Sequence, residues 1–446
     1  MARIHAPEIV AGTWANVAEP LSMAALRGRV VVLHFFTGSC VSCQRTVAEL
    51  RGLEARSGGE VVLVGVRVPR FDAERPIEAL RASVLRLGIT HPVVDDAHGA
   101  TCDRYGVRAW PTVVVVDPDG YVVGATRGDG HGPAIEQAVA ATLAGRPSPA
   151  PGSGPAPLDE RPLRPPEGPL AWPAKVAVHP VGAVVADTGH GRVLVVDLDG
   201  TVRAEHGDLR GPCGVRALAD GTLLVCERDA DRVVRIPADG GPRVELATMA
   251  SPSDVAVAAI GTVFVAEAGR HRIWRIEDGA APAVEAGSGE EGLEDGFGPA
   301  ALFAQPSGLA TGPLGLFVVD AESSALRVVD AQHRVATILG RGTATWGDAD
   351  GTIATALLQH PEGVACAPDG SSVYVADTFN SSLRLWSGVD GELRTLVVDG
   401  LLEPGGLDVL PDGRLVVADT GHHRVVVVDL AAGTVEPLDI RSAPRP

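Results

Sequence analysis

The chain has few of the residues that attract nucleic acids or membranes. Lys175 is its only lysine, and 38 basic residues stand against 56 acidic ones, a net charge of -18. Nucleic acids and anionic membranes bind basic surfaces, so neither is expected as a partner. No apolar run reaches the roughly 18 residues of a membrane span, and the first residues lack a signal-peptide pattern. The sequence predicts a cytoplasmic protein, and its arginine, alanine and glycine bias is typical of a bacterial genome rich in GC.

Cysteine is also scarce. Six cysteines in 446 residues are too few for a disulfide-stabilised scaffold, and a close pair in a cytoplasmic chain is more often catalytic or metal-binding. Four scattered cysteines are interpreted as small buried apolar side chains: Cys102, Cys213, Cys226 and Cys366. The remaining pair, Cys40 and Cys43, has no second Cys-x-x-Cys or matching Cys/His set to complete a zinc site. We therefore expect no metal and no cofactor.

The first 145 residues alternate strand-like and helix-like segments. Continuous apolar runs predict buried parallel strands, and Pro118-Asp119-Gly120 predicts a hairpin. The expected elements are strand 30–36, helix 40–56, strand 61–66, helix 75–87, strands 112–117 and 121–125, and helix 133–143. This β-α-β-α-β-β-α order predicts a thioredoxin-like α/β domain over residues 1–145.

Residues 146–157 are dominated by proline, glycine, serine and alanine. Such a segment cannot bury a core and is expected to be an extended linker. The linker separates the first domain from a second one over residues 158–446.

From about residue 172 the chain repeats a short strand pattern that ends in an acidic residue. The six copies end at Asp187, Glu227, Glu267, Asp320, Asp377 and Asp419. A spacing near 40 residues, with about four strands per copy, is typical of propeller blades. The second domain is therefore predicted to be an all-β, six-bladed propeller, closed by a strand from residues 158–164 or 435–440 because an open propeller would leave an unpaired edge.

Five residues after the acid stands an arginine in four copies, namely Arg192, Arg232, Arg272 and Arg424. We interpret each acid and arginine as a structural pair that repeats from blade to blade. Ala325 and Ser382 replace the arginine in the other two copies, where the pair is expected to be absent.

Two insertions of similar texture, residues 287–296 and 340–351, lengthen adjacent blades. Insertions confined to neighbouring blades are expected on one face of the propeller, where they could form a binding surface. Their acidic residues could suit a cation, although no spacing matches an EF-hand loop. The propeller histidines show no spacing expected of a metal-dependent lyase.

The pair Cys40 and Cys43 is the motif that can perform chemistry, because it follows the strand 30–36 and opens the next helix. Backbone N–H groups and the positive helix end favour a thiolate at Cys40. Cys43 lies one turn further along the same helix face. Cys40 could attack a disulfide and Cys43 could resolve the mixed disulfide.

Two further features accompany the cysteines. Trp110-Pro111-Thr112 stands where thioredoxin folds place a cis-proline, so Pro111 is expected to face the cysteines while Trp110 and Thr112 contact an extended substrate. His34 stands six residues before Cys40, where thioredoxin folds usually keep a buried aspartate that takes the proton of the resolving cysteine. His34 could do the same, or be a core histidine hydrogen-bonded to the backbone.

The whole chain resembles the NHL-repeat-containing thioredoxin-like proteins, with a thioredoxin domain of the TlpA type. The resemblance is carried by residues 6–36, Cys40–Cys43, Trp110–Thr112 and the propeller blocks 303–309, 346–351, 358–364 and 374–378. It implies an NHL-type propeller and a loosely defined role in cell redox homeostasis. Relatives usually have cysteine where Ser39 stands and aspartate at His34, so the redox potential and substrate do not carry over.

Two functions are compatible with this sequence. The first is a thiol-disulfide oxidoreductase in which the propeller binds or orients a protein partner, either a disulfide substrate or a reductant protein. The alternative is a propeller scaffold for protein interactions, with the thioredoxin-like domain as a structural module or redox sensor.

Overall fold

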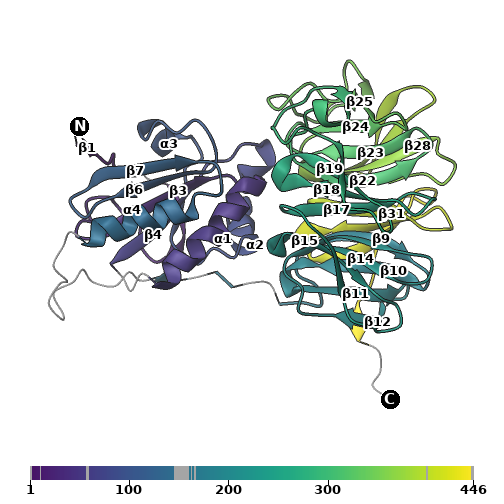
Figure 1. Ribbon diagram of the computed structural model, residues 1–446, viewed down its shortest axis with the longest axis horizontal. Helices are drawn as coiled ribbons and strands as arrows, with labels where there is room; N and C mark the ends of the chain where they lie inside the picture. Colours follow the sequence, from purple (N-terminus) through teal and green to yellow (C-terminus); the bar gives the residue numbers. More distant parts are fainter. Residues whose placement is uncertain are drawn as a thin grey trace. The chain divides into compact units, whose positions relative to one another are not determined.

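The computed structural model describes residues 3–10, 12–56, 60–144, 160–161, 163–164, 167–397 and 400–442. The chain divides into two compact units, residues 1–165 and 166–446, and each is described by itself (Figure 1). None of the described helices is both long and apolar enough to cross a bilayer.

The first unit is built on an eight-stranded sheet with the order β1-β7-β6-β3-β4-β5-β2-β8. Its elements are β1 (Ile4–His5), β2 (Thr13–Val17), β3 (Val30–Phe36), α1 (Val41–Arg56), β4 (Val61–Arg67), the 3-10 turn η1 (Asp72–Glu74), α2 (Ile77–Arg86), β5 (Val93–Asp95), α3 (Ala100–Arg104), β6 (Thr112–Val116), β7 (Tyr121–Arg127), α4 (Gly132–Ala144) and β8 (Glu160–Arg161). The thioredoxin-like fold is confirmed.

Strand β3 forms the centre of this unit because both of its faces are covered. It pairs parallel with β4 and antiparallel with β6. Leu33 and Phe35 pack into one apolar cluster, whereas Val30 and Val32 pack into another with residues of α1 and α4. A strand buried on both sides has a continuous apolar sequence, and the alternation of side chains places His34 on the face of Val32.

The short elements β2, β5 and α3 were not anticipated. Strand β5 has three residues and α3 has five, too few to show a periodic pattern. Strands β2 and β5 are held by long-range pairing, with β5 between β4 and β2.

Strand β8 belongs to the thioredoxin-like sheet. Arg161 pairs with Asn16 of β2, and the Leu163 N–H donates to the Asn16 side-chain oxygen at 2.9 Å. The prediction that residues 158–164 close the propeller is therefore wrong, and the described residues of that segment lie with the first unit. The proposed linker, residues 146–157, lies outside the described residues.

The second unit is a propeller of six sheets, and each sheet contains four consecutive antiparallel strands. The strands are, in blade 1, β9 (Pro173–His179), β10 (Gly182–Asp187), β11 (Arg192–Asp197) and β12 (Thr201–His206); in blade 2, β13 (Pro212–Ala217), β14 (Leu223–Glu227), β15 (Arg232–Ile236) and β16 (Val244–Thr248); in blade 3, β17 (Pro252–Val257), β18 (Val263–Glu267), β19 (Arg272–Ile276) and β20 (Ala283–Ala286); in blade 4, β22 (Pro306–Gly312), β23 (Gly315–Asp320), β24 (Ala325–Val329) and β25 (Arg334–Leu339); in blade 5, β27 (Gly363–Cys366), β28 (Ser372–Asp377), β29 (Ser382–Ser387) and β30 (Glu392–Val397); and in blade 6, β31 (Pro404–Val409), β32 (Leu415–Asp419), β33 (Arg424–Asp429) and β34 (Thr434–Pro437). Figure 1 shows β25 to β22 running from rim to centre, and β9 to β12 continuing to the opposite rim. The six-bladed propeller is confirmed.

The repeated acid at the end of each second strand has the same task in all six blades. Its carboxylate accepts a backbone N–H from the loop before the innermost strand of its own blade. The donors are, in order, the N–H groups of Ala171, Arg210, Ala250, Ala304, Gln359 and Leu402, at 2.7 to 2.9 Å. The repeated acid therefore connects the end of the second strand to the loop before the innermost strand in each blade.

The arginine five residues later pairs with the acid in three blades. Arg192, Arg232 and Arg424 lie 2.7 to 2.8 Å from Asp187, Glu227 and Asp419. The prediction is wrong in blade 3, because the Trp274 indole donates to Glu267 at 2.6 Å and Arg272 turns to the Ser288 carbonyl at 2.9 Å. In blade 5 the position of Ser382 lacks the pair as predicted, but Arg384 reaches Asp377 at 2.8 Å.

The two insertions add an edge strand to the outside of blades 4 and 5. Strands β21 (Gly296–Phe297) and β26 (Gly351–Thr352) pair with β25 and β30. Buried arginines hold them: Arg327 lies 3.0 Å from Asp295, and Arg384 lies 3.0 and 2.6 Å from Asp348 and Asp350. These three carboxylates thus bind guanidinium groups of the protein itself.

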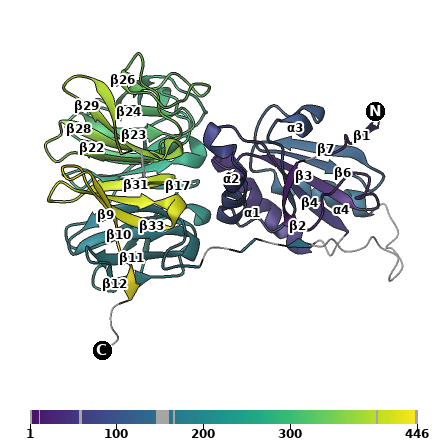
Figure 2. The same cartoon turned by 180° about the vertical axis from the view of Figure 1, so that it is seen from behind.

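The strand that closes the ring lies just beyond residues 435–440, the second of the two predicted ranges. Residues Thr434–Pro437 form β34, the outer strand of blade 6. The following β35 (Arg441–Ser442) crosses to blade 1 and pairs parallel with β12, where the C-terminal yellow arrow is visible beside β12 (Figure 2). Each blade keeps its own four strands, and the described terminus adds a fifth to blade 1.

Candidate active site

The two cysteines of the motif lie at the start of α1. Cys40 directly precedes the helix and Cys43 is in its first turn. The Cys43 N–H lies 3.2 Å from the Cys40 sulfur and 3.1 Å from the Cys40 carbonyl oxygen. An N–H group that points at the sulfur stabilises negative charge there.

The two thiols differ in exposure. Cys40 is partly exposed, whereas Cys43 is fully buried and packs with Phe36, Val47 and Trp110. The partly exposed Cys40 sulfur can meet a substrate, whereas the buried Cys43 sulfur is shielded from solvent.

Trp110, from the segment predicted to face the cysteines, lies beside Cys40. The peptide bond between Trp110 and Pro111 is cis, and the Trp110 carbonyl oxygen lies 4.0 Å from the Cys40 sulfur. Thr112 begins β6, and its hydroxyl donates to the Ala109 carbonyl at 2.7 Å. This hydrogen bond fixes the bend that holds Trp110 and Pro111 beside the sulfur.

His34 is fully buried in β3, and its ring stacks on Phe36 with 5.1 Å between centroids. Neither ring nitrogen has a hydrogen-bond partner among the described residues. Burial, with a smaller contribution from nearby His91, lowers the pKa of His34 to about 3. His34 is therefore neutral at physiological pH, and the alternative of a core histidine hydrogen-bonded to the backbone does not describe it.

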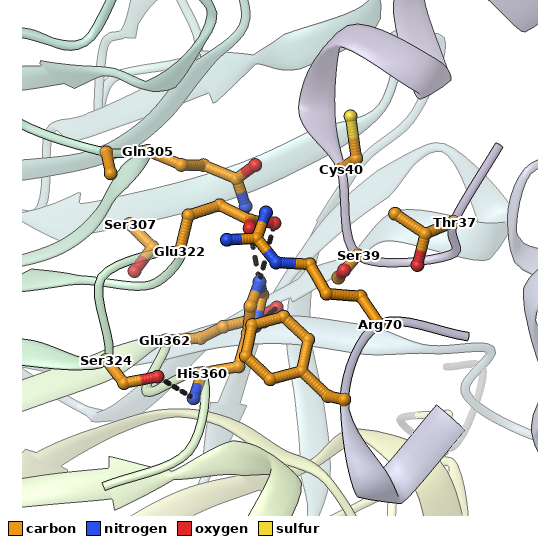
Figure 3. Close-up of polar contacts among 12 residues, drawn as sticks. Thr37, Ser39, Cys40, Arg70, Gln305, Ser307, Glu322, Ser324, His360 and Glu362 are labelled. Atoms are coloured by element: carbon orange, nitrogen blue, oxygen red, sulfur yellow. Dashed lines mark hydrogen bonds and ion pairs between the residues drawn. The ribbon is translucent and has the colours of Figure 1, made fainter. Parts of the chain in front are cut away.

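The loop before Cys40 is held by Glu74, a residue that belongs to none of the sequence motifs. The Glu74 carboxylate, from η1, accepts hydrogen bonds from the Thr37 hydroxyl at 2.8 Å and the Ser39 N–H at 3.1 Å. Figure 3 draws Thr37, Ser39 and Cys40 along this loop. A lone glutamate in a polar loop has no sequence signal that separates it from a solvated one, so only the tertiary contacts identify it.

The comparisons with known proteins divide in the same way as the fold. Residues 5–125 match the AhpC/TSA family, and residues 401–428 match the NHL repeat. The chain is 30% identical over 524 residues to NHL repeat-containing protein 2 of Bos taurus. The match covers 96% of this chain and 70% of that protein. The chain belongs to the NHL repeat-containing protein 2 family. The predicted resemblance is confirmed.

Two other relatives extend the comparison of this family member. Protein SUPPRESSOR OF QUENCHING 1, chloroplastic, of Arabidopsis thaliana is 30% identical over 492 residues, which cover 94% of this chain but only 46% of that protein. The chain thus spans about half the length of the plant relative. Thiol-disulfide oxidoreductase ResA of Halalkalibacterium halodurans is 29% identical over 105 residues, covering 24% of this chain and 57% of that protein.

The propeller of this family member also carries a buried histidine among acids. The His360 ring nitrogens lie 3.7 Å from Glu322 and 3.6 Å from Glu362, and the His360 backbone N–H donates to the Ser324 hydroxyl at 3.1 Å (Figure 3). The ring stacks on Phe379 with 4.5 Å between centroids. Apart from Glu362, the groups around His360 come from distant parts of the chain, so its surroundings have no local sequence signal.

Proposed function

We propose that the thioredoxin-like unit is a thiol-disulfide oxidoreductase, with Cys40 as the nucleophile and Cys43 as the resolving thiol. The observation that carries this proposal is the contact of the partly exposed Cys40 sulfur with the N–H of buried Cys43. The similarity to a thiol-disulfide oxidoreductase over 105 residues supports it.

In the reductive direction, the Cys40 thiolate attacks one sulfur of a substrate disulfide. A Cys40–substrate disulfide forms, and the second substrate sulfur leaves as a thiolate that takes up a proton. Cys43 then loses its proton and attacks the Cys40 sulfur, which releases the first substrate sulfur. The substrate gains two electrons and two protons, the enzyme is left with a Cys40–Cys43 disulfide, and a dithiol reductant restores it.

Trp110, Pro111 and Thr112 are proposed to position the substrate chain. The Trp110 carbonyl, 4.0 Å from the Cys40 sulfur, is placed to accept a hydrogen bond from an extended substrate segment whose cysteine meets Cys40. Pro111 has no backbone N–H. It therefore makes no donor hydrogen bond of its own there, and the backbone beside it stays available to the substrate.

His34 is proposed to receive the proton that Cys43 loses. A neutral, buried imidazole without a hydrogen-bond partner has a free lone pair, and β3 leads directly to the loop that carries Cys40. Because its pKa is about 3, His34 is a weak base that cannot keep the proton, and it would pass the proton to the first substrate sulfur as that sulfur leaves as a thiolate.

The propeller is proposed to bind the protein that exchanges disulfides with Cys40. In each blade the repeated acid holds the loop before the innermost strand. The inserted segments give blades 4 and 5 surfaces that blades 2, 3 and 6 lack. The cytoplasm, where thiols are kept reduced, is the proposed location.

Insulin reduction by the full chain with a dithiol reductant tests the oxidoreductase. We expect Cys40→Ser to abolish turnover and Cys43→Ser to accumulate a mixed disulfide with the substrate, because the resolving sulfur is gone. Cys102→Ala is the matched control, since Cys102 is a buried thiol of the same unit that contacts the Val107 carbonyl. Equal activity of the wild type and Cys40→Ser would support the scaffold instead.

A further inference from the structure

A single buried carboxylate connects the loop before Cys40 to the rest of the thioredoxin-like unit. Glu74 is 3% exposed. Its two oxygens accept hydrogen bonds from the Thr37 hydroxyl, the Ser39 N–H, the Arg70 N–H and the Phe71 N–H, at 2.8 to 3.1 Å. Two donors come from the Cys40 loop and two from the loop that carries Glu74.

The residue between the two active-site donors is packed against the same support. A Cβ atom at Gly38 would lie 2.4 Å from the Ser83 hydroxyl oxygen and 3.2 Å from a Glu74 carboxylate oxygen. No larger side chain fits there without a shift. Three consecutive residues before Cys40, namely Thr37, Gly38 and Ser39, are therefore fixed by contacts with η1 and α2.

The support is itself anchored in the sheet. Arg67, at the end of β4, donates a hydrogen bond to the Glu74 backbone carbonyl. The same guanidinium is fully buried and lies 2.8 Å from the Asp95 carboxylate at the end of β5. Burial raises the pKa of Asp95, while Arg67 acts in the opposite direction. Glu74 is thus linked through Arg67 to the ends of β4 and β5, and these strands fix its position.

We propose that Glu74 is a positioning residue that holds the Cys40 sulfur in register with the first N–H groups of α1. This inference rests on the proposed oxidoreductase function of Cys40. A fixed loop keeps the sulfur aligned with the helix N-terminus before substrate arrives, so no alignment has to be gained during the reaction.

The charge of Glu74 and its positioning role make opposite predictions. A nearby negative charge disfavours a thiolate, so removal of the charge alone would make Cys40 more reactive. Release of the loop would separate the sulfur from the helix N–H groups and make Cys40 less reactive. The direction of the change therefore distinguishes the two roles.

The test is the pH profile of Cys40 alkylation by iodoacetamide in the full chain, read by peptide mass spectrometry. In Glu74→Gln an amide nitrogen replaces one carboxylate oxygen and cannot accept a hydrogen bond. The donors that bind this oxygen in the wild type therefore lose their acceptor. We expect alkylation at neutral pH to slow about fivefold, the size of a lost helix N-terminus interaction, with the profile moved to higher pH. Glu78→Gln, four residues later and exposed, is the matched control and should leave the profile unchanged.

A second pair of variants covers the case in which Glu74→Gln does not fold. Thr37→Val removes one donor and leaves Glu74 its other hydrogen bonds, whereas Thr37→Ser keeps the hydroxyl. Slower alkylation in Thr37→Val and a wild-type profile in Thr37→Ser would support the proposal.

Unchanged or faster alkylation in both Glu74→Gln and Thr37→Val would overturn the positioning role. The outcome is separable from that of the proposed function, because alkylation requires no disulfide exchange. If the wild type fails to reduce insulin while these variants still slow alkylation, the oxidoreductase proposal is wrong and the positioning role stands.

Discussion

At the scale of the residue, the candidate site pairs a partly exposed thiol with a buried one, and the central strand before them carries a buried, neutral imidazole. Cys43 and His34 are both fully buried, while Cys40 is partly exposed. Burial without hydrogen bonds is costly for a polar ring, so His34 is expected to reduce the stability of the unit whether or not it takes part in the chemistry.

The variant His34→Leu tests that cost. The unfolded chain binds a proton at this position below about pH 6.5, whereas the folded chain binds it only near pH 3. The wild type therefore loses stability as the pH falls through this window, by up to about 1.4 kcal/mol per pH unit, and His34→Leu should lose less. Hydrogen exchange of β3 peptides between pH 4 and 7 measures the difference.

The same variant addresses the proton transfer. If His34 takes the Cys43 proton, resolution of the mixed disulfide should slow in His34→Leu and its pH dependence should change. Exposed His98→Gln serves as the control for both measurements. An unchanged pH profile of exchange would remove His34 from the mechanism and leave it a destabilising core residue.

At the scale of the element, the insertions of blades 4 and 5 are held from within. Arg384 is fully buried and contacts Asp377, Asp348 and Asp350, while Arg327 contacts Asp295 and stacks over the Phe303 ring at 4.4 Å. In blade 5 one guanidinium thus joins the blade acid to the inserted loop, from a position two residues later than the paired arginines of blades 1, 2 and 6.

Arg384→Met should destabilise the propeller by about 3–5 kcal/mol, because buried Asp377 would lose its charged partner. The loop of residues 340–351 should become the first site of protease cleavage. Arg394→Met is the control, since Arg394 and its partner Asp390 are exposed and such pairs contribute at most about 1 kcal/mol. Thermal unfolding with limited proteolysis measures both, and equal effects of the two substitutions would contradict the role of Arg384.

At the scale of the whole molecule, the ring of blades is joined between blades 6 and 1 by more than the terminal strand. Leu438 is buried in a cluster with Leu194 and Val196 of blade 1 and Val425 of blade 6, and its N–H donates to the Val425 carbonyl at 2.8 Å. Strand β35 adds only two residues to β12. The apolar contact of Leu438 is therefore expected to outweigh the terminal strand pairing.

Two truncations separate these contributions. A chain ending after Ile440 keeps Leu438 and Ile440, which pack in the cluster between blades 6 and 1, and should lose no more than about 1–2 kcal/mol, the net value of one or two backbone hydrogen bonds. A chain ending after Gly433 also loses β34 and Leu438, and should unfold at a much lower temperature because the blade 6 core opens. Calorimetry of both chains decides, and a shorter deletion as damaging as the longer one would make β35 the lock.

The sequence alone determined the elements that depend on local or periodic patterns. The buried strands 30–36 and 61–66, the Cys40–Cys43 helix start and the six acid-ended repeats all follow from alternation, run length or spacing, which the chain carries in consecutive residues. Only the tertiary structure decided which distant groups meet: Glu74 beneath Thr37 and Ser39, Arg384 in place of an arginine at 382, Trp274 on Glu267, and β8 on the thioredoxin-like sheet. These contacts depend on where separate elements pack, and a lone glutamate, arginine or two-residue strand has the same local sequence whether it is buried by partners or exposed to water.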